Sequence, residues 1–392
     1  MSRFTLRIWQ VMLGGALAVL LLGQISPVNA IYAINIDVMV FLFGMFVVGE
    51  ALSRSGYLDM LARRLFRHAR TPGELVILVL FCFGILSALL MNDTLAIIGT
   101  PLVLGLAARS RLPAKMLLLA LAFAITTGSV ASPIGNPQNL LVAVNSGMTA
   151  PFVTFASSLL LPTVISLAAT WLVLFFFYRK ELGVPLAGET GPATAPDPAL
   201  TRIVQCSLAI LVGLALANII ASLFTGAIVI PLPLIGVAAA LPVLVFSSRR
   251  VAVLRSIDWC TLVFFAAMFV LMAAVWETGF FQSVAGTAGV TSVPAILATS
   301  VVISQFISNV PFVALFSPLI LQAGGGTARL MALAAGSTIA GNLTILGAAS
   351  NVIIIQQAES RGETLTFFEF AKIGVPLTLL QVGIYAVCLG VL

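Results

Sequence analysis

The sequence predicts an all-α, polytopic membrane protein made of two inverted repeats, and three observations lead to this prediction. Of the 392 residues, 60% are hydrophobic and only 8% are charged, whereas soluble domains carry about 25% charged residues. Apolar runs of roughly twenty residues recur along the chain, long enough to cross a bilayer as helices. Landmark residues of the first half also recur in the second half. The composition excludes a soluble enzyme, a nucleic-acid-binding module and a disordered protein, and the long apolar runs exclude a β-barrel.

Nine apolar segments are expected to cross the membrane as helices. They are residues 8–26, 34–52, 116–147, 152–178, 203–224, 229–247, 258–276, 328–356 and 369–391. Two more apolar stretches, 74–109 and 292–322, are interrupted in their middles, and we expect each to form a re-entrant hairpin. Segments 116–147 and 328–356 contain interruptions of their own and are expected to be broken helices. The predicted units are an N-terminal repeat over 1–180, a cytoplasmic linker over 181–201 that is rich in Pro, Gly, Ala and Thr, and a C-terminal repeat over 202–392.

The distribution of basic residues gives the predicted orientation. With both hairpins re-entrant and the N-terminus cytoplasmic, all 19 lysines and arginines except Arg329 lie on the cytoplasmic side, as the positive-inside rule requires. Residues 54–70 are expected to form an amphipathic helix at the membrane surface or a solvated basic loop. Residues 28–30 resemble a signal-peptidase site, so residues 1–30 are either a cleaved signal or, as the closely following spans favour, a retained helix. The expected location is the plasma (inner) membrane of a bacterium or archaeon.

The two halves of the chain carry the same landmarks in the same order, about 220 residues apart. Segment 41–56 matches segment 264–279 through a shared Met-Phe pair and a terminal glycine. The other matched residues are Ser87, Asn92, Pro101, Gly135 and Asn139 in the first half and Ser304, Asn309, Pro318, Gly347 and Asn351 in the second. One hairpin opens to each side of the membrane in the predicted topology, so the repeats are inverted, which is typical of secondary transporters.

The interrupted helices are expected to carry the chemistry. The run Ser132-Pro133-Ile134-Gly135-Asn136-Pro137 cannot continue a helix, because prolines lack the donor and glycine tolerates non-helical φ. Unwound backbone in a membrane lies inside protein or along a watery cavity, where its carbonyls can bind a cation and half-helix N-termini an anion. Gly341-Asn342-Leu343-Thr344 is a weaker break of the same kind. The four matched asparagines are costly in lipid and are expected to be functional, whereas Ser87 and Ser304 are also compatible with close helix packing.

Asp93 is the carboxylate that stands deepest in an apolar segment, and a charge buried there indicates function. It can carry a proton, bind sodium or serve as a neutral hydrogen-bond donor. Glu50 and Glu277 stand at helix ends, where we expect solvation at the interface. No arginine or lysine is expected to be buried, so bound cations would supply the positive field that holds an anion. The four cysteines have neither metal-ligand nor redox spacing.

These residues resemble the ion transporter superfamily, which includes divalent anion/sodium symporters, citrate permeases, arsenite efflux permeases and some sodium/proton antiporters. The resemblance covers nearly the whole chain and rests on the tips at Asn92 and Asn309, the phrase 132–139 and the stretch 347–351. It implies an elevator-type transporter that forms a homodimer, in which the hairpins and broken helices move against the remaining spans.

The resemblance also implies the positions of the sites. One sodium ion would bind Ser87, Asn92 and the Gly135 carbonyl, and its mirror Ser304, Asn309 and the Gly347 carbonyl. The cation-binding candidates, for sodium or a proton, are Ser87, Asn92, Asp93, Gly135, Asn139, Ser304, Asn309, Gly347 and Asn351. The substrate-binding candidates are Asn92, Thr94, Pro133, Asn136, Ser308, Asn309, Val310, Pro311 and Thr344. Anion symporters of this group carry Ser-Asn-Thr at both tips, whereas these tips read Asn92-Asp93-Thr94 and Ser308-Asn309-Val310, and an aspartate disfavours a dianion unless it is protonated or holds a cation.

We therefore predict a secondary active transporter that moves a small anion, a carboxylate or an oxyanion, coupled to sodium or protons by an elevator mechanism. The alternative is an arsenite or antimonite efflux permease, or a sodium/proton antiporter. An enzyme is not expected, because no catalytic pair lies within the spans, and a passive channel would not need inverted repeats. The expected partners are the anion, sodium or protons, the lipid bilayer and a second copy of the chain, with no nucleic acid. No cofactor is expected, apart from sodium as a coupling ion.

Overall fold

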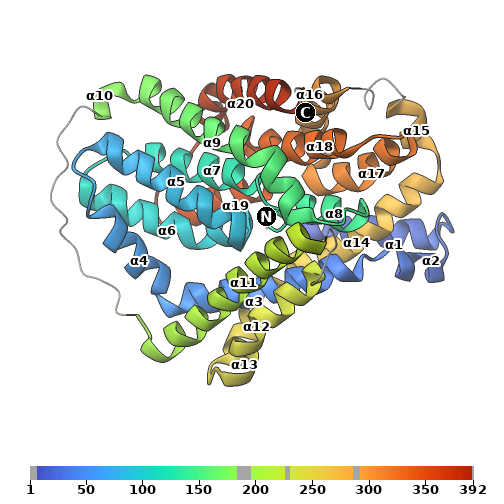
Figure 1. The fold of residues 1–392 in the computed structure, drawn as a ribbon, viewed down its shortest axis with the longest axis horizontal. Coiled ribbons are helices and arrows are strands. Elements are labelled where there is room, and N and C mark those ends of the chain that lie inside the picture. Colours follow the sequence, from blue (N-terminus) through green and yellow to red (C-terminus); the bar gives the residue numbers. More distant parts are fainter. Residues whose placement is uncertain (1–6, 183–195, 226–229, 286–291, 391–392) are drawn as a thin grey trace, which may run out of the picture.

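The computed structural model describes residues 7–182, 196–225, 230–285 and 292–390, and within these ranges the chain forms helices and no strand (Figure 1). The predicted all-α class is confirmed. Six of the described helices are long and apolar enough to cross a membrane. They are α3 (Ile36–Ser55), α5 (Pro72–Leu90), α9 (Pro151–Phe177), α11 (Pro198–Thr225), α14 (Trp259–Glu277) and α20 (Phe367–Gly390).

Two helix pairs and two interrupted helices occupy the positions of the expected hairpins and breaks. The pairs are α5 with α6 (Asn92–Ser110) and α16 (Val293–Ile307) with α17 (Asn309–Gln322). The first interrupted helix consists of α7 (Ala114–Ser129) and α8 (Pro137–Asn145). The second consists of α18 (Thr327–Ile339) and α19 (Ala349–Glu359), with two short 3-10 turns between them at Ala340–Asn342 and Ile345–Gly347.

The remaining helices are shorter. They are α1 (Ile8–Leu21), α2 (Pro27–Ala33), α4 (Tyr57–Phe66), α10 (Arg179–Leu182), α12 (Leu232–Phe246), α13 (Arg250–Ser256) and α15 (Phe280–Ala285). Helix α4 lies within the basic segment 54–70, with Leu58, Ala62 and Phe66 buried on one side. Of the expected linker, residues 183–195 lie outside the described residues, and α11 already begins at Pro198.

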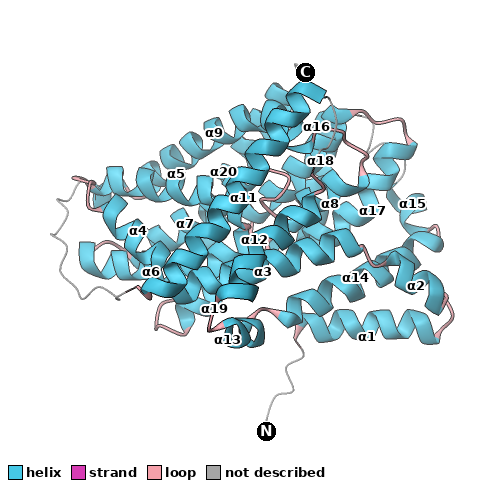
Figure 2. Cartoon of the chain, turned by 60° about the horizontal axis from the view of Figure 1, so that its bottom comes forward, coloured by secondary structure: helices cyan, strands magenta, loops and turns pink. Residues whose placement is uncertain are grey.

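The first apolar segment is shorter than the span expected over residues 8–26. Helix α1 has 14 residues, about 21 Å at 1.5 Å per residue, which is less than the ~30 Å of hydrocarbon. It ends because Gly23 takes a φ of 68°, a left-handed conformation that stops a helix. Helix α1 lies along α14 (Figure 2), and Gly15 faces the Leu271 side chain.

Residues with positive φ mark the same points in both halves of the chain. Gly56 follows α3 and Gly279 follows α14, with φ of 68° and 69°. Met91 and Ser308, with φ of 62° and 68°, turn the chain between the two helices of each pair. Arg111 and Gly324 end the pairs, and Gly147 and Gly362 follow α8 and α19. The backbone of the described residues therefore reproduces the order of landmarks that the sequence repeats.

The two interrupted helices form the centre of the molecule. Every residue from Met116 to Ser129 of α7 and from Leu330 to Ile339 of α18 is buried. Each packs against the first helix of the neighbouring pair, α7 against α5 and α18 against α16. Helices α5 and α7 approach so closely that a Cβ on Gly128 would lie 2.2 Å from the Gly84 carbonyl oxygen. Small residues permit this kind of contact between membrane helices.

Helices α3, α11 and α12 pack against one another and form a second group beside the interrupted helices. Helix α3 packs on α12 and α11, with Gly44 of α3 facing the Gly236 backbone of α12.

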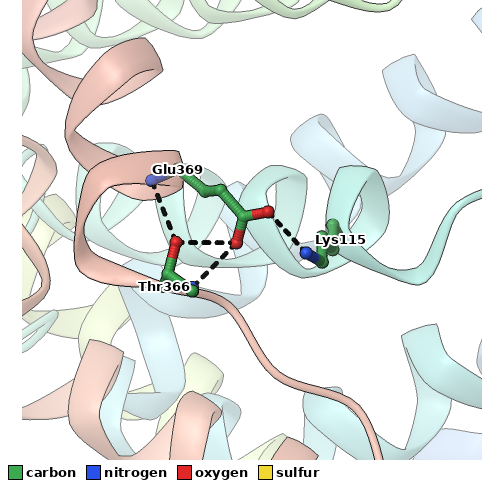
Figure 3. Close-up of polar contacts among 3 residues, drawn as sticks. All are labelled: Lys115, Thr366 and Glu369. Carbon is green, nitrogen blue, oxygen red and sulfur yellow. Dashed lines mark hydrogen bonds and ion pairs between the residues drawn. The ribbon is translucent and has the colours of Figure 1, made fainter.

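An ion pair between Lys115 and Glu369 joins the start of α7 to the start of α20 (Figure 3). Glu369 also accepts hydrogen bonds from the Thr366 amide and hydroxyl at 2.9 Å.

Candidate functional site

The hairpin tips are single residues held in an unusual backbone conformation. Met91 separates α5 from α6 with φ 62° and ψ 137°, and Ser308 separates α16 from α17 with φ 68° and ψ 161°. Residues other than glycine rarely adopt positive φ, and such strain concentrates at functional sites. Asn92 and Asn309 are therefore the first residues of the returning helices, and both are buried.

An asparagine side chain holds the first break together. The Asn139 side-chain amide donates hydrogen bonds to the carbonyl oxygens of Ser129, Val130 and Ser132 at 3.0–3.2 Å. Asn136 caps α8 by accepting the Asn139 backbone N–H at 2.8 Å. The amide nitrogen of Asn139 thus occupies carbonyls that the break has freed.

The second break has the same arrangement with fewer contacts. The Asn351 side-chain amide donates to the Gly341 carbonyl at 2.6 Å and to the Thr344 carbonyl at 3.4 Å. The Asn351 side-chain oxygen is buried without a hydrogen-bond partner among the described residues, whereas that of Asn139 accepts from the Thr338 hydroxyl at 3.3 Å. The two matched asparagines therefore position the breaks, and only one of them is fully satisfied by protein.

The cation-site residues expected in the N-terminal repeat all form hydrogen bonds within the protein. The Asn92 backbone N–H donates to the Gly135 carbonyl at 3.0 Å, which joins the hairpin tip to the first break. The Asn92 side-chain oxygen accepts the Asp93 N–H at 3.0 Å. Ser87 donates its hydroxyl to the Ile125 carbonyl at 2.6 Å. The Asn92 side-chain oxygen and the Gly135 carbonyl thus each accept a hydrogen bond within the protein, and the Ser87 hydroxyl donates one.

The matched residues of the C-terminal repeat are buried but not bonded in this way. The Ser304 hydroxyl and the Asn309 side-chain oxygen have no hydrogen-bond partner within the described ranges. Among those residues no hydrogen bond joins the Asn309 N–H to the Gly347 carbonyl. Buried polar atoms are nearly always paired, so each of these unpaired oxygens is a candidate to bind an ion or water.

A buried polar network that the sequence did not indicate joins the two repeats. Asn136 donates to the hydroxyls of Ser129 and Thr338 at 2.9 and 3.2 Å, and Gln138 donates to Thr338 at 3.3 Å. A second group links Asn342, Thr127 and Gln381 through hydrogen bonds of 2.8–3.0 Å.

Gln305 is a further residue that the sequence analysis missed. It donates to the Ala340 carbonyl at 2.9 Å and accepts the Thr344 hydroxyl at 2.8 Å, so it ties the second hairpin to the second break. An amide in the apolar helix α16 was the available signal. Thr344, a substrate-binding candidate, spends its hydroxyl on this contact.

A cavity of about 730 Å³ lies between α3 and α14 on one side and α6 and α19 on the other. Its polar lining includes Asp93, Thr94, Glu50, Asp258 and Arg7. Of the predicted site residues, Asp93 and Thr94 line this cavity. Pro133 and Asn136 lie in the first break, and Ser308, Val310 and Pro311 lie at the second tip; none of these lines either described cavity.

The carboxylates of this cavity differ in their partners. Glu50 pairs with the Arg54 guanidinium at 2.6 Å. Asp258 accepts the Thr261 N–H at 3.0 Å and the Thr261 hydroxyl at 2.6 Å. The Asp93 side chain forms neither a hydrogen bond nor an ion pair with any described residue. Asp93 is therefore the cavity carboxylate left open to a ligand.

The structure adds detail to two expectations about charge. Glu50, expected at a solvated helix end, is partly exposed and also lines the cavity, because α3 runs past the hairpin tip. A Cβ on Gly49 would come within 2.5 Å of the Thr94 side chain, which shows how closely the two elements meet. No buried basic residue was expected. Arg7 lines the cavity but is exposed, whereas Arg109 is partly exposed and has a buried Nε atom.

The sequence profile described as "Citrate transporter" matches residues 1–329, which is most of the chain. The chain belongs to the citrate transporter family. Among its relatives, an uncharacterized transporter of Mycobacterium tuberculosis is 30% identical to this chain, and the match covers 97% of this chain and 92% of the relative. The silicon efflux transporter LSI3 of Oryza sativa subsp. japonica is 28% identical, over 94% of this chain and 90% of its own length.

A solved structure supports the fold. The YdaH transporter of Alcanivorax borkumensis has a TM-score of 0.62 and 17% sequence identity, covering 93% of this chain and 87% of that chain. The expected superfamily is thus confirmed, and the protein is a multi-pass membrane transporter.

Proposed function

We propose that the protein is a secondary active transporter that carries a small anion through the cavity of about 730 Å³, called the central cavity below, and is coupled to protons at Asp93 and to sodium at Ser304 and Asn309 of the C-terminal hairpin. The observation that carries this proposal is the unequal bonding of the two repeats. In the N-terminal repeat the expected ligand groups all form hydrogen bonds within the protein, but the neighbouring Asp93 side chain has no such bond and lines the cavity. In the C-terminal repeat the oxygens themselves lack partners.

Ser304 and Asn309 of the C-terminal hairpin support sodium coupling. Hard cations prefer oxygen ligands, and the Ser304 and Asn309 side chains offer buried oxygens beside the second break. Both side chains are uncharged, so a monovalent ion costs less to dehydrate at these oxygens than a divalent one.

Proton coupling is argued from Asp93. An anion in the cavity meets the N-terminal ends of α6 and α19, through Thr94 and Ala349, and helix N-termini attract negative charge. The same anion is repelled by an ionised Asp93. Protonation of Asp93 removes that repulsion, so binding of a proton and of a multiply charged anion would be cooperative.

An elevator movement is supported by the grouping of the helices. The hairpins and interrupted helices pack against one another, α6 against α19 and α17 against α8, while α3, α11 and α12 form a separate group. The cavity lies between α6 and α19 of the first group and α3 of the second. Sliding of one group against the other would expose the cavity to each side in turn, and a homodimer would anchor the stationary group.

A second candidate function follows from the cavity's charge. Three carboxylates face one arginine in its lining, which suits an uncharged weak acid or a cation better than a dianion. Efflux of a hydroxide such as arsenite or antimonite, or sodium/proton antiport, would use Asp93 as the exchanging group. The likeness to a silicon efflux transporter supports this alternative.

Flux measurements on the reconstituted protein distinguish these functions. Proteoliposomes are loaded with pH or sodium gradients, and uptake of labelled citrate, uptake of arsenite and sodium-driven proton movement are followed. We expect citrate accumulation driven by either gradient, and Asp93→Asn should abolish the proton-driven part while Asp37→Asn, on the exposed start of α3, leaves it intact. Arsenite or sodium/proton exchange without citrate uptake would establish the second candidate, and unchanged pH-driven uptake in Asp93→Asn would refute the role of Asp93.

A further inference from the structure

A second cavity, of about 270 Å³, lies where α3, α4 and α6 meet. The end of α3 contributes Ser53 and Gly56, α4 contributes Asp59 and Arg63, and α6 contributes Gly105 and Arg109. Ser53 and Ile98 line both this cavity and the central one, so the two are neighbours. Two guanidinium groups and one carboxylate line the smaller cavity, which gives it an excess of positive charge.

Arg109 is the unusual member of this lining. Its Nε atom is buried and has no hydrogen-bond partner among the described residues. Its guanidinium folds back along α6 to lie 3.7–3.9 Å from the position of a Cβ on Gly105, where no larger side chain intervenes. A buried N–H donor without an acceptor costs free energy, and a bound anion would remove that cost.

Arg63 supplies the second guanidinium. Its Nε donates to Asp59 at 2.9 Å, four residues earlier on α4, which orients the side chain. This ion pair uses one of its five N–H donors, and the others remain available to a ligand. A pair of arginines with forked donors matches the oxygens of a carboxylate or phosphate better than lysines would.

The shape of the cavity depends on a proline and a glycine in α6. Ile98, Pro101, Leu102, Gly105 and Arg109 follow one another at helical spacing and face α3 and α4. Pro101 lies inside the helix, and Gly105 has no side chain to fill the space under Arg109. A volume of about 270 Å³ accommodates one phosphate or carboxylate group with bound water.

We propose that Arg63 and Arg109 form a binding site for an oxyanion, a carboxylate or a phosphate, next to the central cavity. The site shares no residue with the predicted cation sites of the two hairpins, and it does not depend on which ion couples transport. The oxyanion can come from water, as a soluble anion, or from the bilayer, as the phosphate of an anionic lipid beside the amphipathic helix α4. Both sources present the same chemistry to the two arginines.

Binding to the purified full-length protein tests the site. Thermal unfolding is followed in neutral-lipid nanodiscs against inorganic phosphate and citrate, and separately in nanodiscs with and without phosphatidylglycerol. We expect one of these probes to raise the unfolding midpoint of the unaltered protein and Arg109→Gln to weaken that effect roughly tenfold. Arg64→Gln removes the same charge from the exposed side of α4 and should change nothing.

The outcomes separate the sources and the failures. A response to phosphate or citrate that Arg109→Gln removes establishes a soluble anion, and a response to phosphatidylglycerol alone that it removes establishes a lipid phosphate. If Arg109→Gln does not fold, Arg63→Gln is measured in its place, with Arg109→Lys as the variant that keeps the charge. No stabilisation by any probe, or equal losses in Arg64→Gln and Arg109→Gln, would overturn the proposal.

Discussion

The two hairpins have similar backbone turns at their tips and differ in how the polar atoms there are hydrogen-bonded. In the N-terminal repeat, Ser87 bonds to the Ile125 carbonyl and Asn92 to the Gly135 carbonyl. In the C-terminal repeat, the Ser304 and Asn309 oxygens are buried without partners among the described residues. Two repeats with the same backbone geometry can therefore differ in ligand binding, because one side-chain contact decides whether a carbonyl or hydroxyl is free for a ligand.

The same inequality appears where the breaks cross. Thr338, from the C-terminal repeat, donates to Asn139 in the first break. The sequence-equivalent pair, Thr126 and Asn351, faces the second break, where both side-chain oxygens lack a partner within the described residues. The first break is therefore the more rigid of the two, and the second has more capacity to bind an ion or water.

The largest expected effect concerns packing, where the repeats also differ. Gly128 contacts the Gly84 backbone of the first hairpin, whereas the equivalent position in the second repeat is already Ala340. Gly128→Ala should lower the free energy of unfolding by about 3 kcal/mol, because a Cβ cannot fit against backbone atoms. Thermal unfolding in detergent measures this. Gly213→Ala, where nothing lies within 4 Å of the added Cβ, serves as the control, and equal losses at both positions would contradict the close approach of α5 and α7.

The asparagines of the breaks should differ in their contribution to stability. Asn139→Ala removes three hydrogen bonds to carbonyls and should cost about 2–3 kcal/mol. Asn351→Ala removes two, one of them long, and should cost about 1–2 kcal/mol. The two variants are compared by unfolding in the absence of sodium. A larger loss in Asn351→Ala would show that the second break is the better-ordered one.

The two serines should separate stability from ion binding. Ser87→Ala removes a buried hydrogen bond and should lower stability by about 1 kcal/mol without changing the response to sodium. Ser304→Ala removes no hydrogen bond, so the ion-free protein should unfold at nearly the same temperature. Its sodium-dependent stabilisation should weaken roughly tenfold. Thermal shift against sodium, with choline as the control cation, measures both; the reverse result would place sodium in the N-terminal pocket.

The smallest effect is expected at the ion pair between α7 and α20. Lys115 and Glu369 are 42% and 41% exposed, so water screens their attraction. Lys115→Gln should lower the free energy of unfolding by less than about 1 kcal/mol. The loss should shrink further at high salt, which a salt titration of the unfolding midpoint can show. A salt-independent loss of several kcal/mol would mean that the pair is buried in the membrane-embedded protein.

Local signals in the sequence predicted much of the fold. The prolines around Gly135 predicted the first break, because a missing donor ends a helix wherever it occurs. The Asn-to-Pro spacing predicted the tips at Asn92 and Asn309, and the helices there begin at these residues. The predicted length of the first span, residues 8–26, was wrong, because Gly23 ends the helix inside an otherwise apolar run.

The site was predicted less completely. Gln305, Thr338 and Gln381 lie in largely apolar helices, and a polar residue in such a helix does not reveal its partner. Glu50 and Arg7 looked like residues at the membrane surface, because hydropathy places a residue along its own helix and says nothing of the helix beside it. Their positions in the cavity depend on contacts between elements far apart in the chain.

The amino-acid sequence by itself determined that this protein is helical and membrane-embedded, that its halves repeat and that its helices break at matched polar motifs. These properties depend on hydrocarbon thickness and backbone hydrogen bonding, which act within single segments. Tertiary packing, in contrast, sets which oxygens are hydrogen-bonded, which carboxylate lacks a partner and which arginine has a buried Nε atom. Those outcomes depend on distances of about 3 Å between separate helices, and a hydropathy pattern does not contain such distances.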